Sequence, residues 1–416
     1  MDHDVVIVGA GLAGLACART LQASGVDVLV LESSDGVGGR VRTDEVDGFH
    51  LDRGFQILLT AYPELQRWFD LDALGFRRFA PGARVRIDGR FRTVGDPLRR
   101  PADLPATIAA PVGSLADKLR LLRLIASVRR GSARDLLHRR DMSTADRLRL
   151  AGFSDRFIDS FMRPLFAGIQ LDPDLEVSAR RFEMILRMLA VGDSGVPASG
   201  MGALPAALAE PLIAGSVRLL TPVASVSPGA VTTADGTHLT ARHVVVATDG
   251  PTAARLVRSV EDPGSRAVAA IWFAMDAPAV DGRAILLDGD GSGPVRNVAM
   301  LSNVAPTYAP PGRSLMVAAV PGPEALGPDL ESTSRRQMRQ WFGTVVETWE
   351  TLRVDVIRHG QPLQTPPLDP RRAVRIDEGL WVCGDHRDTA SIQGALYSGR
   401  RTAESILSDL RPTTVI

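Results

Sequence analysis

The chain has 416 residues and no net charge, and 45% of its residues are hydrophobic. This length exceeds one ordinary core of about 100–200 residues, so we expect a globular protein with two domains. The balanced charge gives no overall attraction to nucleic acid, and the two distant cysteines, Cys17 and Cys383, exclude a disulfide scaffold and a cysteine metal site. We therefore expect neither a metal nor a nucleic-acid partner.

The first 32 residues predict a strand–turn–helix–strand unit. Residues 4–8 form an apolar, β-branched run that is typical of a strand buried on both faces. The stretch GAGLAG follows at residues 9–14, residues 15–23 predict a helix, and residues 26–31 predict a second strand that ends at Glu32. This order is typical of a Rossmann dinucleotide-binding unit.

The glycines of this turn each have a physical task in binding a dinucleotide. Gly9 permits a tight turn, Gly11 lets the backbone approach a pyrophosphate, and Gly14 lets the helix pack closely on the strand. The start of the helix offers free N–H groups to the phosphates. Glu32 stands 18 residues after Gly14, where its carboxylate can accept hydrogen bonds from ribose hydroxyls.

A second glycine pair indicates FAD. Gly38 and Gly39 allow the backbone to fold back over the first turn, and Arg40 can meet the pyrophosphate, which one helix end neutralises only in part. With these motifs the chain resembles the superfamily of flavin-containing amine oxidases, phytoene desaturases and protoporphyrinogen oxidases. The stretches RGFQ at residues 53–56 and GDHRD at residues 384–388 resemble above all the motifs of its phytoene-desaturase-like members. The resemblance implies that FHLDRGFQ at residues 49–56 runs under the isoalloxazine ring, with Gly54 at the family's glycine position.

The middle of the chain predicts a separate substrate domain. Residues 83–87 and 90–94 flank Asp88-Gly89, which is a strong signal for a two-residue β-hairpin. Residues 98–190 are expected to be mainly helical, and the clearest helix lies between the N-cap Ser114 and Gly131. The leucines and isoleucine that line one face of this helix are Leu115, Leu119, Leu122 and Ile125.

The same region carries an excess of positive charge. Residues 77–150 contain 18 arginines or lysines against 7 aspartates. A basic amphipathic region can dock on an anionic membrane surface, and an ordinary solvated helical subdomain explains the charge equally well. We keep peripheral membrane contact through residues 98–150 as one expectation.

The order of elements after residue 198 resembles the superfamily as well. A glycine-bearing turn at residues 198–205 precedes a helix to about residue 212, and strands are expected at 217–220, 229–233 and 242–247. The resemblance implies that the backbone of Val223 contacts the adenine. It predicts an α/β fold with a discontinuous Rossmann-type FAD-binding domain (residues 1–75, 200–260 and 350–416) and an α+β substrate domain (76–199 and 261–349) with a mixed sheet and a helical insertion.

The sequence VCGDHRDTASIQGA near the end of the chain predicts the second half of the flavin site. A short strand at residues 380–383 ends at Gly384, and the resemblance implies that Asp385 hydrogen-bonds the ribityl chain. The helix that begins near residue 391 can direct its free N–H groups at N1 and O2 of the isoalloxazine, where negative charge develops on reduction. The predicted cofactor-binding residues are Gly9, Gly11, Leu12, Ala13, Gly14, Glu32, Gly38, Gly39, Arg40, Gly54, Phe55, Gln56, Val223, Gly384, Asp385, Ile392, Gln393 and Ala395.

The type of reaction is predicted from residues that typical amine oxidases have and that this chain lacks. Residues 261–345 contain none of the lysines that typical amine oxidases keep near flavin N5, and Ser391 stands where those enzymes have a cage tyrosine. No cysteine is placed for a covalent link, so FAD is expected to be non-covalent. We expect hydride transfer to N5 from an apolar, isoprenoid- or tetrapyrrole-like substrate, with Arg53 and Gln56 as candidate catalytic residues. For His386 and Arg387 a structural role is favoured.

Three alternatives remain open at this stage. They are an amine oxidase without the usual lysine and cage, an isomerase that uses reduced FAD, and a non-catalytic binding protein of the GDP-dissociation-inhibitor type. The expected electron acceptor is oxygen or a quinone. The N-terminus has no signal-peptide pattern, and no uncharged apolar stretch reaches about 18 residues, so the expected location is the cytoplasm, with or without membrane association.

Overall fold

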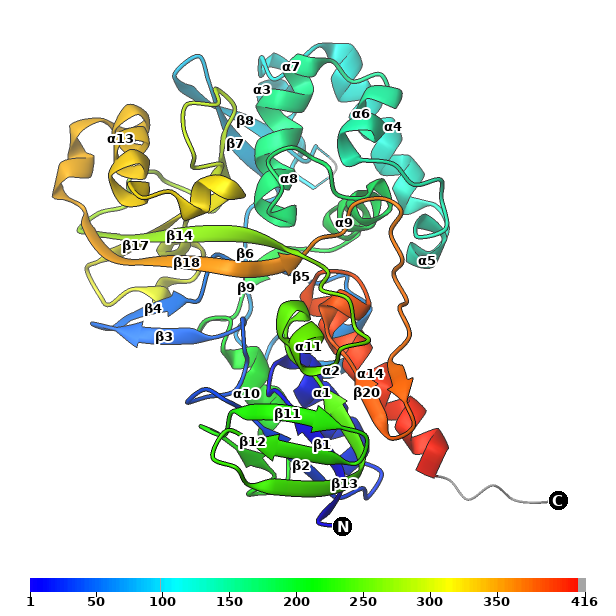
Figure 1. Cartoon of the computed structure of the whole chain (residues 1–416). Coiled ribbons are helices and arrows are strands. Elements are labelled where there is room, and N and C mark those ends of the chain that lie inside the picture. The colour runs from blue at the N-terminus through cyan, green and yellow to red at the C-terminus, as the bar shows by residue number, and fades with distance from the viewer. Residues whose placement is uncertain (98, 411–416) are drawn as a thin grey trace.

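The chain folds into two lobes, each built on its own sheet (Figure 1). The computed structural model describes residues 1–97 and 99–410. Position 98, which begins the stretches predicted to be helical and to contact a membrane, lies outside the described residues. The same holds for residues 411–416 of the predicted FAD-binding domain.

A parallel sheet forms the centre of the lower lobe, where residues from both ends of the chain lie together (Figure 1). Its parallel strands have the order β10-β2-β1-β13-β20, and β12 and β11 extend the sheet in antiparallel fashion. The strands of this lobe are β1 (His3–Val8), β2 (Val28–Leu31), β10 (Val217–Arg218), β11 (Val223–Ser227), β12 (Ala230–Thr233), β13 (His238–Val246), β19 (Arg375–Asp377) and β20 (Leu380–Val382).

Strand β1 is apolar on both sides because both faces of the sheet are covered. Val5 and Ile7 pack into the core under helices α1 (Leu12–Gln22) and α14 (Ile392–Leu410), whereas Val6 and Val8 pack into a second core with α11 (Gly250–Leu256). Helices α1 and α14 cross closely, since a Cβ built on Gly399 would lie 2.0 Å from the carbonyl oxygen of Ala13. Helix α10 (Ala203–Ala209) also contacts α1.

A mixed seven-stranded sheet forms the centre of the upper lobe. Its order is β18-β14-β17-β16-β15-β7-β8, and the pairing of β15 with β7 is parallel. Helix α13 (Leu330–Phe342) packs on one face, and α12 (Leu301–Val304) lies beside β17. The strands are β7 (Gly82–Ile87), β8 (Arg90–Gly95), β14 (Ser265–Met275), β15 (Ile285–Asp288), β16 (Asn297–Met300), β17 (Ser314–Pro321) and β18 (Glu350–Pro362).

A helical cap covers the upper lobe, and β14 and β18 run between it and the lower lobe (Figure 1). Its helices are α3 (Leu104–Ala109), α4 (Leu115–Arg129), α5 (Ala133–Leu136), α6 (Thr144–Leu150), α7 (Asp155–Phe157), α8 (Arg163–Gln170) and α9 (Ala179–Val191). The connections between the lobes hold α2 (Pro63–Trp68), the pair β3 (Thr43–Val46) and β4 (Phe49–Asp52), and the small sheet of β5 (Leu58–Leu59), β6 (Arg77–Arg78) and β9 (Ser194–Val196).

Two local predictions are confirmed. Strands β7 and β8 pair as an antiparallel hairpin, and both turn residues, Asp88 and Gly89, have positive φ as a type I′ turn requires. Helix α4 begins after Ser114, which forms a capping box with Asp117, and Gly131 follows its end with a φ of +70°.

Other boundaries differ from the predictions. The first helix begins at Leu12 instead of residue 15, because Gly11 already serves as its N-cap and its carbonyl accepts the N–H of Leu15. The second strand begins at Val28, not at residue 26, because Val26 still belongs to the turn and donates its N–H to Leu21. Among the described residues, no helix combines the length and hydrophobicity that a bilayer crossing requires.

Candidate flavin-binding site

The first glycine turn joins β1, α1 and β2 through short backbone contacts. The N–H of Gly9 donates to the carbonyl of Leu31 at 2.8 Å. A Cβ on Gly14 would lie 2.0 Å from the carbonyl oxygen of Gly9, so only glycine permits this approach of helix to turn. A Cβ on Gly11 would meet no atom within 4 Å. The turn therefore leaves open space at the position predicted to face a pyrophosphate.

The second glycine turn lies against the first, as expected from the sequence. The N–H of Gly38 donates to the carbonyl of Ala10 at 2.8 Å, and Gly38 and Gly11 form a parallel bridge. Gly38 and Gly39 have φ values of +116° and +58°, which L-residues rarely adopt. Two glycine turns that are separate in sequence thus form one cradle of backbone.

Glu32 fastens this cradle to the end of β2. One carboxylate oxygen accepts the N–H of Ala10 at 2.7 Å, and the other accepts the N–H and hydroxyl of Ser34 at 2.9 and 2.8 Å. The Ser33 hydroxyl also donates to this second oxygen at 3.4 Å, whereas the first oxygen accepts the Ala10 N–H and keeps an acceptor position for a sugar hydroxyl. Ribose binding by Glu32 stays a prediction.

Arg40 and Asp385 form an ion pair between the two chain ends. Arg40 Nη2 lies 2.7 Å from Asp385 Oδ1, and Nη1 donates to the carbonyl of Gly360 at 2.8 Å. The sequence placed the two side chains in one site but did not predict this contact. The only available signal was their opposite charge beside two glycine turns, which does not specify a partner 345 residues away.

Arg53 and Gln56, which follow β4, have different hydrogen-bond partners. Arg53 donates from Nε and Nη2 to the two carboxylate oxygens of Asp44, both at 3.0 Å, and Arg353 binds the same carboxylate at 2.8 Å. This pairing favours a structural role for Arg53. Gln56 donates to the carbonyl of Arg40 at 2.8 Å, and its Oε1 is buried without a partner among the described residues.

Three further residues predicted to bind the cofactor are Gly54, Phe55 and Val223. Gly54 has a φ of +90°, and a Cβ there would lie 2.6 Å from Ile357 on β18. Phe55 packs at the edge of the main core, and Val223 begins β11, opposite Thr233. The unpaired Oε1 of Gln56 is the acceptor in this group that a bound ligand could satisfy.

The side chains of Ser391 and Gln393 form hydrogen bonds at the start of α14. Ser391 Oγ accepts the N–H of Gly394 at 3.0 Å. The N–H groups of Ile392 and Gln393 lie in the first turn of the helix and therefore have no intrahelical acceptor. The Gln393 side chain accepts the N–H of Glu64 at 2.8 Å. Ala395 continues the helix and donates to the carbonyl of Ser391. The helix end therefore presents the partial positive charge predicted from the sequence.

A buried ion pair ties α14 to α2 close to this helix start. Arg400 Nη2 and Nε lie 2.5 and 3.1 Å from the two carboxylate oxygens of Glu64, and Trp68 Nε1 donates to the same carboxylate at 3.0 Å. Arg400 also reaches the exposed Glu404. The carboxylate of Glu64 raises the pKa of Arg400, so this guanidinium stays charged.

His386 and Arg387 follow Asp385 in a short turn. His386 is buried, neither ring nitrogen has a partner among the described residues, and burial lowers its pKa to about 4. Its imidazole is therefore neutral at pH 7. Arg387 donates from Nε to the carbonyl of Ala373 at 3.1 Å, which agrees with a structural role.

Sequence reasoning missed a buried carboxylate at the end of β4, that of Asp52. Asp52 accepts hydrogen bonds from the Thr43 hydroxyl (2.6 Å), the Met201 N–H (2.8 Å) and the Tyr308 hydroxyl (2.9 Å). It thereby joins β4, the turn before α10 and the upper lobe. Burial nevertheless raises the pKa of Asp52 from 3.8 to about 6. A buried acid within the quoted stretch FHLDRGFQ was the available signal.

Replacing Asp52 with asparagine is expected to change how stability depends on pH. A raised pKa in the folded state means that the contribution of Asp52 to stability is largest below pH 4 and is lost as the pH rises through 6. Since the variant lacks this titration, its unfolding free energy relative to wild type should increase by about 3 kcal/mol over that interval. Urea denaturation at pH 4 and pH 7 measures this, and an unchanged difference would contradict the pKa of Asp52.

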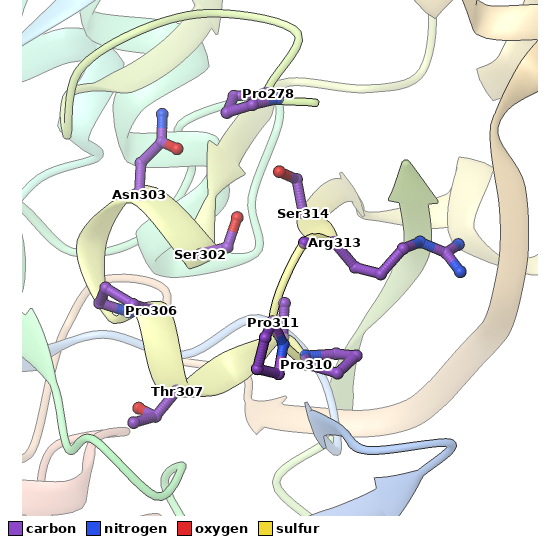
Figure 2. Close-up of a pocket in the computed structure, with 11 residues that line it drawn as sticks. Pro278, Ser302, Asn303, Pro306, Thr307, Pro310, Pro311, Arg313 and Ser314 are labelled. Carbon is purple, nitrogen blue, oxygen red and sulfur yellow. The ribbon is translucent and has the colours of Figure 1, made fainter. Parts of the chain in front are cut away.

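A groove of about 530 Å³ opens on the upper lobe beside α12 (Figure 2). Pro306, Pro310, Pro311 and Arg313 line it together with Ser302. None of the predicted cofactor-binding residues contributes to it. Arg313 is already placed over the ring of Phe49 and near Glu350, so the groove carries no free charged group for catalysis.

Comparison with known proteins gives a consistent result. The model of the family described as flavin containing amine oxidoreductase matches residues 12–407. A putrescine oxidase of Kocuria rosea is 44% identical over 96 residues, a match that covers 22% of this chain and 20% of that protein. A coproporphyrinogen III oxidase of Propionibacterium freudenreichii is 28% identical over 400 residues and covers 79% of this chain and 75% of that protein.

The fold is also found among solved structures. The crystal structure of a protein named putative protoporphyrinogen oxidase from Exiguobacterium sp. 255-15 superimposes with a TM-score of 0.74 at 19% identity, covering 98% of this chain and 99% of the other. At this identity the likeness concerns the fold alone. It agrees with the α/β architecture that the sequence predicts.

Proposed function

Because the chain belongs to the flavin containing amine oxidoreductase family, we propose that it oxidises a C–H bond of an apolar substrate by hydride transfer to N5 of FAD. The chain is an FAD-dependent oxidoreductase. A non-covalently held FAD is part of the proposal, because both cysteines, Cys17 and Cys383, are buried in the core. The proposal concerns the reaction and the substrate class, an isoprenoid- or tetrapyrrole-like molecule. The match to a coproporphyrinogen III oxidase over most of the chain supports it.

The residues of the cradle fit FAD. The open space at Gly11, the stacked glycine turns and the start of α14 would hold its phosphates and the pyrimidine end of its ring. Bound FAD supplies a two-electron acceptor. Asp385 holds the Arg40 guanidinium in the cradle, and the N–H groups of Ile392 and Gln393 stabilise negative charge without reorganisation.

One observation carries the choice of an apolar substrate over an amine. The single lysine of the chain, Lys118, lies in the helical cap and donates to the carbonyls of Ile108 and Ala110 at 2.6 and 2.7 Å. It is therefore committed to a local structural role. Ser391, at the position of the cage tyrosine, caps α14 with its hydroxyl. The site thus lacks the two groups by which amine oxidases handle an amine.

Amine oxidation remains the second candidate because of the putrescine oxidase match. Reduction of the flavin without oxygen separates the two. Putrescine should leave the visible flavin absorbance unchanged, whereas a reduced polyene or tetrapyrrole should bleach it. Chemically reduced enzyme should reoxidise in air over many minutes and rapidly with a quinone. Bleaching by putrescine within the mixing time would overturn the proposal in favour of an amine oxidase.

Peripheral membrane contact belongs to the same proposal. Three of the four residues of the predicted apolar face of α4, Leu115, Leu119 and Leu122, are exposed, whereas Ile125 packs on the main core. Leu104 and Ile108 of α3 are exposed as well. The surrounding stretch carries the excess of arginine noted above. Exposed leucines among cations suit an anionic lipid surface from which an apolar substrate could enter.

Changing Leu115, Leu119 and Leu122 together to serine is expected to reduce binding to phosphatidylglycerol vesicles at least tenfold. Each leucine loses roughly 1 kcal/mol or more of favourable burial in the lipid interface. Vesicle sedimentation measures this. The matched control changes three exposed side chains of the lower lobe, Ile213, Leu219 and Leu220, to serine and should bind like wild type. Equal binding by the two triple variants would exclude α4 as the contact.

A further inference from the structure

Arg181 is a buried cation whose hydrogen-bonding capacity is only partly used. It lies on α9 with 2% of its surface exposed. Nη2 donates to Gln361 Oε1 at 2.6 Å and to the carbonyl of Ala390 at 2.7 Å. Nε and Nη1 have no partner among the described residues, and no carboxylate there forms an ion pair with this side chain.

Such an arrangement is unfavourable unless a further group completes it. Taking a guanidinium out of water costs several kcal/mol when no anion compensates it. Burial lowers the pKa of Arg181 only to about 10, so the side chain keeps its charge at pH 7. The structure thus holds a permanent positive charge with unused N–H donors inside the protein.

Two further buried polar groups with free capacity come from segments linked to Arg181, one through Gln361 and one through a charge interaction. Gln170, at the end of α8, is fully buried, and neither its Oε1 nor its Nε2 has a partner among the described residues. Tyr62 is buried, its hydroxyl makes no hydrogen bond there, and its charge interaction with Arg181 affects the pKa of both groups. Gln361 connects the region by donating to the carbonyl of Ile169 at 3.0 Å.

Arg181, Gln170, Tyr62 and Gln361, here called the cluster, are connected to the predicted flavin site by hydrogen bonds of Arg181 and by the chain next to Gln361. Ala390, whose carbonyl Arg181 binds, lies two residues before Ile392, the first residue of α14. Gly360, next to Gln361, accepts Arg40 Nη1, and Arg40 pairs with Asp385. Arg181 therefore reaches from the helical cap to the loop that the predicted flavin contacts, which is where a substrate between the two lobes would lie.

We propose that Arg181, with Gln170 and Tyr62, binds a carboxylate on the otherwise apolar substrate. This inference rests on the proposed function, because it concerns the substrate of the same site. Asp385 and Asp172 attract Arg181, but they are paired with Arg40 and Arg266, so Arg181 itself lacks a direct anionic partner. One negative charge suits this guanidinium, which favours a carboxylate over a phosphate monoester with about −1.5 to −2 at neutral pH. The carboxylate fixes one end of the molecule and so selects which C–H bond faces the flavin.

Decanoate and decanol are suitable probes because they share a chain and differ in charge. Each is titrated into the FAD-loaded enzyme, and binding is followed as a perturbation of the flavin absorbance. Wild type should bind decanoate more tightly than decanol. Arg181→Met should bind decanoate roughly 10- to 100-fold more weakly, as expected for lost charge-assisted hydrogen bonds, and decanol as before. Arg181→Lys should retain part of the preference.

Arg180→Met is the matched control. Arg180 is the preceding residue of α9, and its guanidinium binds the carbonyls of Arg139 and Leu368 instead of the cluster. It should keep the decanoate preference. Equal binding of the two probes by wild type, or an unchanged preference in Arg181→Met, would overturn the proposal.

Two other outcomes are also informative. Loss of FAD from both Arg181 variants would assign the side chain to the cofactor and overturn its role toward substrate. If Arg181→Met does not fold, the probe preferences of wild type and Arg181→Lys decide. A wild-type protein that takes up no FAD at all would instead refute the proposed function.

Discussion

Gly11→Val is expected to give a folded protein that no longer binds FAD. Gly11 has an extended backbone (φ −71°, ψ 176°) that valine can adopt, and a Cβ there meets no protein atom within 4 Å. The added side chain would instead fill the space predicted for the pyrophosphate. We expect at least a 100-fold loss of FAD affinity, measured by fluorescence titration of the apoprotein, with a circular dichroism spectrum like that of wild type.

Gly11→Ala and Gly14→Ala complete this experiment. The smaller side chain at Gly11 should weaken FAD binding less than valine does. A methyl group at Gly14 would lie 2.0 Å from the Gly9 carbonyl, so that variant should lose stability as well as FAD. If Gly11→Val binds FAD like wild type, the pyrophosphate does not lie over this turn.

Glu64→Gln is expected to destabilise the protein by about 1–3 kcal/mol, the effect typical of removing one partner of a buried hydrogen-bonded group. The partly buried Arg400 guanidinium would keep only Glu404 as an anionic partner, and the Trp68 indole would lose its acceptor charge. Urea denaturation followed by tryptophan fluorescence measures the loss, and Trp68 reports it locally.

Glu404→Gln is the control for this prediction, because it removes a second carboxylate from the same arginine. Glu404 is exposed, so its loss should cost about 0–1 kcal/mol. Replacing Glu64 with leucine and Arg400 with methionine together should recover most of the stability, since apolar groups can take the place of a buried pair. Equal effects of the two glutamine variants would show that burial does not distinguish the carboxylates.

The sequence predicted the elements whose causes are local. The turn at Asp88-Gly89, the cap at Ser114 and the stacking of the two glycine turns depend on residues within a short stretch, and the structure has all three. The start of α1 was placed three residues late because the glycine turn and the first helical turn share Leu12–Gly14, and no residue type marks that boundary.

Contacts between distant segments could not be predicted in this way. The Arg40–Asp385 pair, the Asp52–Tyr308 bond and the unpaired donors of Arg181 depend on how two lobes meet, and a periodic pattern carries no information about that. The apolar face of α4 was recognised from its spacing. That most of it points to solvent follows from the packing of Leu124 and Val128 on the opposite side.

The parallel sheet of the lower lobe has a consequence for protein synthesis. Strand β20 adds to this sheet beside β13, and helix α14, which begins at Ile392, packs on α1, which begins at Leu12, 380 positions earlier in the chain. During translation the N-terminal Rossmann segment therefore leaves the ribosome long before its covering helix exists, so the apolar face of this segment stays uncovered by α14 in the meantime. If the start of α14 forms part of the FAD site as predicted, FAD is expected to bind only after this helix has been made.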